Sequence, residues 1–282
     1  MPQTQAQIEY GRRRTRGNQQ ARANYELPVH FFIPDTQVRP GVLTNHIEWI
    51  GQYFHDEYSD HVTKVIQIGD HWDMSSLSSY DRGTGKMEGR RYIKDVDAGN
   101  DAFALLDSYL DGADEKHFFF GNHEERITRA ANQSVEYDGL ITLDSLETLD
   151  WQRHEFLEAV NLDGIMYSHY FYAPNSGRAY SGANLETRLK QVLTSFSMGH
   201  QQGLKWGRIE TIKGPLIGLV AGSCYLHDEE YKGPQANNHW RGIVICHQVE
   251  DGAYDPMIVS LDYLCRRYEN MRLVDFRERY EC

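Results

Sequence analysis

Three features are scarce in this chain of 282 residues, and each scarcity excludes a class of protein. The four cysteines show no Cys-x-x-Cys spacing, which argues against a thiolate zinc site and a disulfide framework. No apolar run approaches the ~20 residues of a membrane span, and no signal-peptide core begins the chain. Acidic residues outnumber basic ones, and the net charge of −12 argues against a general polyanion-binding surface. We therefore expect a cytoplasmic globular protein with reduced thiols and no membrane partner.

Basic residues gather at one place, the N-terminus. Residues 1–27 contain five arginines and two glutamates among glutamine and asparagine. Because this segment has too little apolar content to pack, we predict a basic, flexible N-terminal arm. An arm that contacts nucleic acid or another subunit is the alternative. Residues 28–282 are long enough for a large core, and we expect one domain with loop insertions around 74–91 and 132–160.

Apolar residues alternate between strand-like runs and helical spacing in the first half of the chain. Runs at 29–33, 62–68 and 116–120 predict buried strands, and helices are expected at 45–58 and 92–110. Asn45 and Glu48 resemble a capping box at the start of the first helix. The second half is rich in strands, with runs at 165–167, 193–198, 217–221, 242–249 and 257–260. The predicted fold is α/β (mixed α+β), with two packed mixed β-sheets flanked by α-helices.

A short polar motif follows each of five apolar runs. The motifs are Pro34-Asp35-Thr36-Gln37, Gly69-Asp70-His71-Trp72-Asp73, Gly121-Asn122-His123-Glu124, Ser168-His169 and Gly199-His200-Gln201-Gln202. Loops at the carboxyl ends of strands are where α/β sheets place their sites, so the five loops should converge. Carboxylates, an asparagine amide and imidazoles together form the ligand set for a pair of divalent ions. Any one motif alone could be a turn or a core residue, and their joint occurrence carries the prediction.

The order of these motifs resembles that of the calcineurin-like metallophosphoesterase family, from Asp35 to Gln202. The phrases around Gln37 and Gln202 are similar to a bacteriophage-type branch, which implies a location in the host cytoplasm. The resemblance implies a metal-dependent phosphoesterase that hydrolyses a P–O bond by in-line attack of a dimetal-bound hydroxide. A phosphodiester in nucleic acid or a nucleotide is the favoured substrate. The alternatives are a phosphomonoesterase or protein phosphatase, and a catalytically weak member that only binds phosphate-containing ligands.

The resemblance assigns metal roles to a set of side chains: Asp35, Gln37, Asp70, Asn122, His169, His200 and Gln202. Asp35 and Gln37 would face the first ion, and Asp70 would bridge both ions. Glutamine stands at positions 37 and 202, where the family usually has histidine, and amide oxygens suit harder ions than imidazoles do. We therefore expect a weak first site that prefers Mn or Mg. The second site should take Mn, with Fe, Zn, Ni or Co as alternatives.

The same resemblance implies catalytic residues, and the loops beside the motifs suggest substrate-binding ones. His123 would protonate the leaving oxygen, and Asp73 would hold the His123 ring in the right tautomer. Phosphate oxygens need further cations, and Arg126 and Arg178 are the best-placed candidates because each lies in a loop beside a motif. His71 stays open between a ligand and a core residue. The polar segment 222–231 looks functional, although no ligand rule selects a member of it, and the oligomeric state is not predicted.

Overall fold

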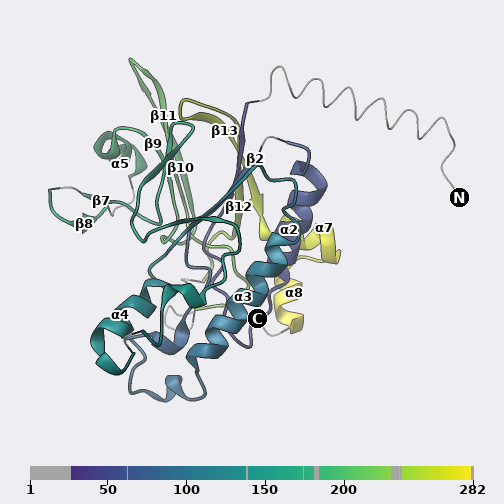
Figure 1. The fold of residues 1–282 in the computed structure, drawn as a ribbon. Helices are drawn as coiled ribbons and strands as arrows, with labels where there is room; N and C mark the ends of the chain where they lie inside the picture. Colours follow the sequence, from purple (N-terminus) through teal and green to yellow (C-terminus); the bar gives the residue numbers. More distant parts are fainter. Residues whose placement is uncertain are drawn as a thin grey trace, which may run out of the picture.

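The computed structural model describes residues 27–280, apart from residues 62, 138, 174, 181–183, 230–234 and 236. The arm predicted at 1–27 lies outside these residues except for Leu27. The described elements form four layers: helices, a six-stranded sheet, a five-stranded sheet and one further helix (Figure 1). This arrangement confirms the predicted fold of two mixed sheets flanked by helices.

The six-stranded sheet has the order β13-β12-β1-β2-β3-β4. Its strands are β13 (Ala253–Ser260), β12 (Gly242–Glu250), β1 (Val29–Ile33), β2 (Thr63–Gln67), β3 (Glu115–Phe119) and β4 (Gln152–His154). Strands β1 to β4 are parallel to their neighbours in that series, whereas β12 and β13 are antiparallel. The carboxyl ends of β1, β2 and β3 therefore meet at one edge, where the first three motifs begin.

The five-stranded sheet has the order β10-β11-β9-β6-β5. Its strands are β10 (Leu204–Thr211), β11 (Gly214–Ala221), β9 (Ser195–Met198), β6 (Ile165–Tyr167) and β5 (Val160–Leu162). Strand β9 is parallel to both β6 and β11, so His169 and His200 follow two adjacent parallel strands. A small hairpin of β7 (Tyr172–Ala173) and β8 (Arg178–Ala179) projects beside this sheet (Figure 1).

Successive apolar side chains of the central strands point to opposite faces of the sheet and contribute to two separate cores. Phe31 and Val65 pack on the helical side, whereas their neighbours Phe32 and Ile66 pack between the two sheets. Because successive side chains of a strand point to opposite faces, one short apolar run fills both layers. Each such buried side chain stabilises the fold by about 1.5–3 kcal/mol relative to exposure. The sheet pair is therefore a rigid support for the loops at its edge.

Helices cover the outer faces of the two sheets. Four helices lie on the six-stranded sheet: α2 (Asn45–Tyr58), α3 (Tyr92–Asp107), α7 (Leu261–Glu269) and α8 (Leu273–Tyr280). Helix α5 (Leu185–Val192) packs on the outer face of the five-stranded sheet. Helix α2 has the predicted bounds, but the predicted capping box is wrong. Asn45 is already helical, and its amide reaches Glu269 of α7 at 3.5 Å instead of capping the helix.

The predicted insertions consist of short elements. The segment 74–91 contains two 3₁₀ turns, η1 (Ser75–Leu77) and η2 (Gly85–Met87). Helix α4 (Glu125–Gln133) leads into the segment 132–160, which holds η3 (Val135–Tyr137), η4 (Leu143–Ser145) and β4. Cys224, Cys246 and Cys265 are free and buried, as expected of core thiols. Of the helices in the described part of the chain, none has the length and apolar content needed to cross a bilayer.

Candidate metal centre

The loops after β1 and β2 are joined to each other by backbone hydrogen bonds. Gln37 donates its amide to the Asp70 carbonyl at 2.9 Å, and Asp73 donates to the Val38 carbonyl at 2.9 Å. Val38 and Trp72 form a parallel bridge that extends the pairing of the two strands. These bonds hold the predicted ligands of the first loop against those of the second.

Two glycines let the second and third loops approach each other. Gly69 has φ +98°, and a Cβ there would lie 2.6 Å from the Gly121 nitrogen. At Gly121, a Cβ would lie 2.2 Å from Asp70 Oδ1. The space that glycine leaves brings the His123 amide to Asp70 Oδ1, to which it donates at 2.8 Å. Only glycine permits this approach, because any side chain would occupy the position of the Asp70 carboxylate.

Glu124 holds the same loops together from below, a role that the sequence analysis did not assign. Its carboxylate accepts the amides of Asp70 at 3.0 Å, Trp72 at 2.9 Å and Gly121 at 2.8 Å. Glu124 is fully buried, and burial together with the Asp70 charge raises its pKa to about 7. The one hint of this role in the sequence was the position of Glu124 as the last residue of the third motif.

The ligands predicted for the second ion converge in the structure. Ligand atoms of Asp70, His169 and His200 all lie within 4.8 Å of one another. Asn122 Oδ1 accepts from His200 Nδ1 at 2.6 Å and lies 3.1 Å from His169 Nε2. His169 Nδ1 lies 2.7 Å from the Ile68 carbonyl, which can only accept, so Nδ1 carries the hydrogen and Nε2 faces the cluster. This is the orientation that a metal-binding imidazole needs.

The charges in this cluster are strongly coupled. Burial opposes the charge on His169, but the Asp70 carboxylate outweighs it and raises the His169 pKa to about 9. Burial likewise disfavours ionised Asp70, yet His123 and His169 hold the Asp70 pKa well below its usual range. Burial and the neighbouring His169 lower the pKa of His200 to about 4. A buried carboxylate that depends on surrounding positive charge to stay ionised is a site to which a cation binds readily.

The residues predicted for the first ion adjoin this cluster. Asp35 is 1% exposed, and both its oxygens accept the His200 amide at 3.1 Å. Burial raises the pKa of Asp35 to about 7. Gln37 Oε1 is buried and has no hydrogen-bond partner among the described residues. Since an unpaired buried oxygen costs about 1–3 kcal/mol, this acceptor beside carboxylates and imidazoles fits a divalent ion that would use it.

Gln202 is held by a partner of its own. It lines the same pocket as Gln37, but its amide nitrogen donates to the Tyr225 hydroxyl at 2.9 Å. Its carbonyl oxygen is the only side-chain atom that could face an ion. Gln202 therefore lines the pocket with its amide nitrogen held by Tyr225. Its predicted role as a metal ligand stays a prediction.

The predicted acid, His123, is paired with Asp73. Their Nδ1 and Oδ1 atoms are 2.9 Å apart, an ion-pair distance without the alignment of a hydrogen bond. His123 Nε2 lies 3.8 Å from Asp70 Oδ2 and accepts from Arg126 Nη2 at 3.0 Å. Burial would lower the His123 pKa, but the Asp70 charge raises it above the usual value. The arrangement favours an imidazole that holds a proton beside the carboxylate cluster.

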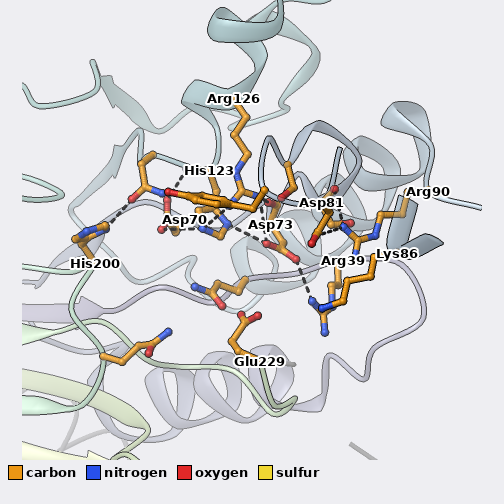
Figure 2. A pocket seen from close by; sticks show the side chains of 16 residues that line it. Arg39, Asp70, Asp73, Asp81, Lys86, Arg90, His123, Arg126, His200 and Glu229 are labelled. Carbon is orange, nitrogen blue, oxygen red and sulfur yellow. Dashed lines mark hydrogen bonds and ion pairs between the residues drawn. The ribbon is translucent and has the colours of Figure 1, made fainter. Parts of the chain in front are cut away.

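A pocket of about 380 Å³ opens above these side chains (Figure 2). His200 lies at one end, Asp70, His123 and Asp73 lie in the middle, and basic side chains lie at the other end (Figure 2). Of the lining residues, Arg39, Tyr80, Lys86 and Glu229 were not singled out by the sequence. Glu229 belongs to the polar segment 222–231, which was the one available signal for it.

The two predicted substrate arginines differ in position. Arg126 lines the pocket and donates to the Asp73 carbonyl at 2.7 Å. Arg178 is exposed on β8 and is not among the described residues that line the pocket, so its predicted role in substrate binding stays a prediction. The β7–β8 hairpin that carries Arg178 projects away from the sheets (Figure 1). His71 is a core residue, with its ring nitrogens 2.7 Å from Thr36 Oγ1 and 3.0 Å from the Gly99 carbonyl.

Comparison of the chain with protein-family models and with curated proteins found no match. The family resemblance therefore remains a prediction from the motifs.

Proposed function

We propose that this protein is a metal-dependent phosphoesterase of the calcineurin-like type that hydrolyses a phosphodiester. The observation that carries the proposal is the convergence on Asp70. The carboxylate of Asp70 lies 3.4 Å from His169 Nε2 and 3.8 Å from His123 Nε2, and Asn122 and His200 complete the group. A ligand set on one side of a carboxylate and an acid on the other are what hydrolysis of a phosphate ester needs.

The ligands divide into two groups that share Asp70. Asp35 and Gln37 would hold one divalent ion. The other ion would be held by Asn122, His169 and His200. Bound ions lower the pKa of water and offset the negative charge of the phosphate. The Gln37 oxygen has no hydrogen-bond partner to lose among the described residues, and burial favours a neutral His200 imidazole, whose Nδ1 would exchange its contact with Asn122 for an ion.

His123 is the proposed general acid, and Asp73 is its positioning residue. His123 would deliver a proton from Nε2 to the leaving oxygen, since Nδ1 faces the Asp73 carboxylate. Arg126 Nη2 contacts the same Nε2 atom at 3.0 Å, and two donors cannot share that contact once Nε2 is protonated. Protonation of His123 would therefore release Arg126 Nη2 from this contact, and the guanidinium could then bind a non-bridging oxygen of the substrate.

The purified chain in Mn²⁺ should hydrolyse bis-p-nitrophenyl phosphate faster than p-nitrophenyl phosphate. His123→Ala should lower kcat by roughly 10²–10⁴-fold while Mn²⁺ affinity, measured by calorimetry, changes little. His55→Ala is the matched control, because His55 is exposed on α2 outside the pocket. Turnover of the monoester alone would make the protein a phosphatase. No turnover of either ester in any divalent metal would refute the proposal.

A further inference from the structure

We propose that Glu229 is a specificity-determining residue that accepts a hydrogen bond from a hydroxyl group of the substrate. The favoured substrate is then a phosphodiester with a hydroxyl on the carbon next to the esterified one, as in a ribonucleotide or a glycerol diester. This substrate class rests on the proposed hydrolysis, because the ions and His123 set the position of the phosphate.

The polar segment 222–231 is fixed to the loops of the candidate metal centre. The Cys224 amide donates to the Asp35 carbonyl at 2.7 Å, which joins the segment to the first loop. Two residues further on, the ring of His227 stacks on that of Tyr225 with centroids 4.7 Å apart. The end of the segment is therefore held at a defined place beside the pocket.

Glu229 points into the pocket, whereas its neighbour Asp228 is exposed and accepts from Arg241 Nη2 at 2.9 Å. The Glu229 backbone is held by Asn237, which accepts from the Glu229 amide at 3.0 Å and donates to its carbonyl at 3.1 Å. The side chain of Glu229 lines the pocket and enters it from the side opposite His123 (Figure 2). The backbone thus fixes the direction of the side chain and leaves the carboxylate for another partner.

The Glu229 carboxylate is buried, yet it accepts no hydrogen bond from a described residue. Glu229 is 6% exposed, and His227 Nε2 lies 3.6 Å from its Oε1, which is too long for a hydrogen bond. Burial opposes the charge, but the neighbouring His227 brings the Glu229 pKa below its usual value. An ionised carboxylate can accept several hydrogen bonds, so this one keeps its acceptor capacity for a ligand.

The other acids that line the pocket already have partners. Asp73 contacts His123 at 2.9 Å and two arginines, and Asp81 contacts an arginine at 2.7 Å. Asp70 faces the proposed ions. Among the described lining acids, this leaves Glu229 without an ion pair to an arginine or lysine and without a proposed ion.

A carboxylate opposite a bound phosphate repels it unless the substrate offers a hydrogen-bond donor. The described acidic and basic residues that line the pocket are equal in number, so two divalent ions would leave the loaded site positive. That excess disfavours an ammonium group and favours a neutral donor. A hydroxyl on the carbon next to the ester is the neutral donor that a phosphodiester can carry closest to its phosphorus.

Glu229→Gln is the decisive variant, because it removes the charge, keeps the shape and leaves the backbone bonds intact. The readout is the ratio of kcat/KM for uridylyl-uridine to kcat/KM for its 2′-deoxy form, with His123→Ala as the background from contaminating ribonuclease. The parent chain should favour the ribose about tenfold, and Glu229→Gln should bring the ratio near one. Glu278→Gln, exposed on α8 outside the pocket, should keep the parent ratio.

A second pair of substrates distinguishes the sources of the hydroxyl. Glycerophosphoglycerol carries the hydroxyl on glycerol, and bis(3-hydroxypropyl) phosphate lacks it. A ratio that depends on Glu229 only in this pair would identify a glycerol diester, and one only in the uridine pair would identify a ribonucleotide. An unchanged ratio in Glu229→Gln for both pairs would refute the specificity role.

A binding measurement separates this role from the proposed function. Calorimetry in Mn²⁺ with the His123→Ala protein should show about tenfold tighter binding of uridylyl-uridine than of its 2′-deoxy form, and adding Glu229→Gln should remove the preference. If the parent chain hydrolyses no ester but this preference depends on Glu229, the hydrolytic function is wrong and the specificity role stands. An equal loss of turnover on every substrate, with weaker Mn²⁺ binding, would make Glu229 a metal ligand and overturn the specificity role.

Discussion

Gln37 combines two features that are unusual for a folded protein. Its carbonyl oxygen is buried without a partner among the described residues, and its backbone has φ 41°. Both features cost free energy, and a residue keeps them when the surrounding structure holds it in place. Here the backbone of Gln37 is held by a hydrogen bond from its amide to the Asp70 carbonyl at 2.9 Å. A hard divalent cation would recover that cost through the free oxygen.

Gln37→His should raise the affinity of the first site for Zn²⁺ relative to Mg²⁺, by about tenfold, because imidazole suits transition metals. Histidine tolerates the positive φ better than most residues, so the loop should keep its shape. Calorimetric titration with each ion measures the change. Gln191→His, on the exposed face of α5, controls for an added surface histidine. Identical titrations for both variants would mean that the side chain at position 37 does not touch an ion.

Helix α3 positions the loop that carries Asp70 and Asp73. Trp72 stacks on Phe103 of α3 with ring centroids 5.4 Å apart, and its indole donates to Asn100 Oδ1 at 3.1 Å. The adjacent His71 ring lies 3.0 Å from the Gly99 carbonyl. At Gly99 the helix touches the indole so closely that a Cβ would lie 1.9 Å from Trp72 Cδ1. The geometry of the candidate metal centre therefore depends on a helix that carries none of the predicted ligands.

Gly99→Ala tests that dependence, because two effects oppose each other. Alanine in a helix interior gains about 1 kcal/mol over glycine. Overpacking against an indole that cannot move costs about 1–3 kcal/mol or more, and the contact distance favours the upper end. We expect net destabilisation in urea unfolding and weaker Mn²⁺ binding. Gly85→Ala, with no atom within 4 Å, should be close to neutral. A stabilised Gly99→Ala protein would show that Trp72 can move aside.

At the edge away from the candidate metal centre, the two sheets are joined by a group of polar side chains around the buried His30 ring. His30 on β1 lies 2.9 Å from Asp163 in the β5–β6 turn and 2.8 Å from the Tyr167 hydroxyl. Lys64 on β2 lies 3.1 Å from the same Asp163 carboxylate. Burial lowers the His30 pKa to about 4, although Asp163 acts in the opposite direction. The contact between the sheets therefore depends on a histidine that stays neutral.

The contribution of His30 to the stability of the fold should therefore fall as the pH decreases from about 6.5 to 4, against the opposite effect of Asp35 and Glu124, whose pKa values are raised. In that window the unfolded chain binds a proton at His30 and the folded chain does not, so the free energy of unfolding decreases as pH falls. The shift corresponds to about 3 kcal/mol. Urea unfolding at pH 7 and pH 4.5 measures it. His30→Asn should reduce the pH dependence by nearly one proton, and His55→Ala should not. An unchanged slope in His30→Asn would exclude His30 as the cause.

Local pattern was sufficient for the elements that one short segment specifies. Helix α2 and strand β1 have the predicted bounds. The helical spacing of apolar residues in α2 and the continuous apolar run of β1 can each be recognised within about a dozen residues. The convergence of the polar loops was also predictable, since each motif directly follows a strand and the carboxyl ends of parallel strands meet at one edge. Helix α5, strand β10 and the two C-terminal helices were missed. They are short, polar on their exposed sides and defined by what they pack against.

Contacts between segments that are far apart in the sequence could not be predicted from the local sequence pattern. Gly121 is required because Asp70, 51 residues earlier, occupies the space beside it, and Glu124 matters because three amides from two loops point at it. Tyr80, Lys86 and Glu229 reach the pocket from an insertion and from a loop near the C-terminus. Composition and order along the chain thus specified which chemical groups would assemble. The packing of the sheets set their distances and pKa values, because burial and mutual charge exist only once the segments meet.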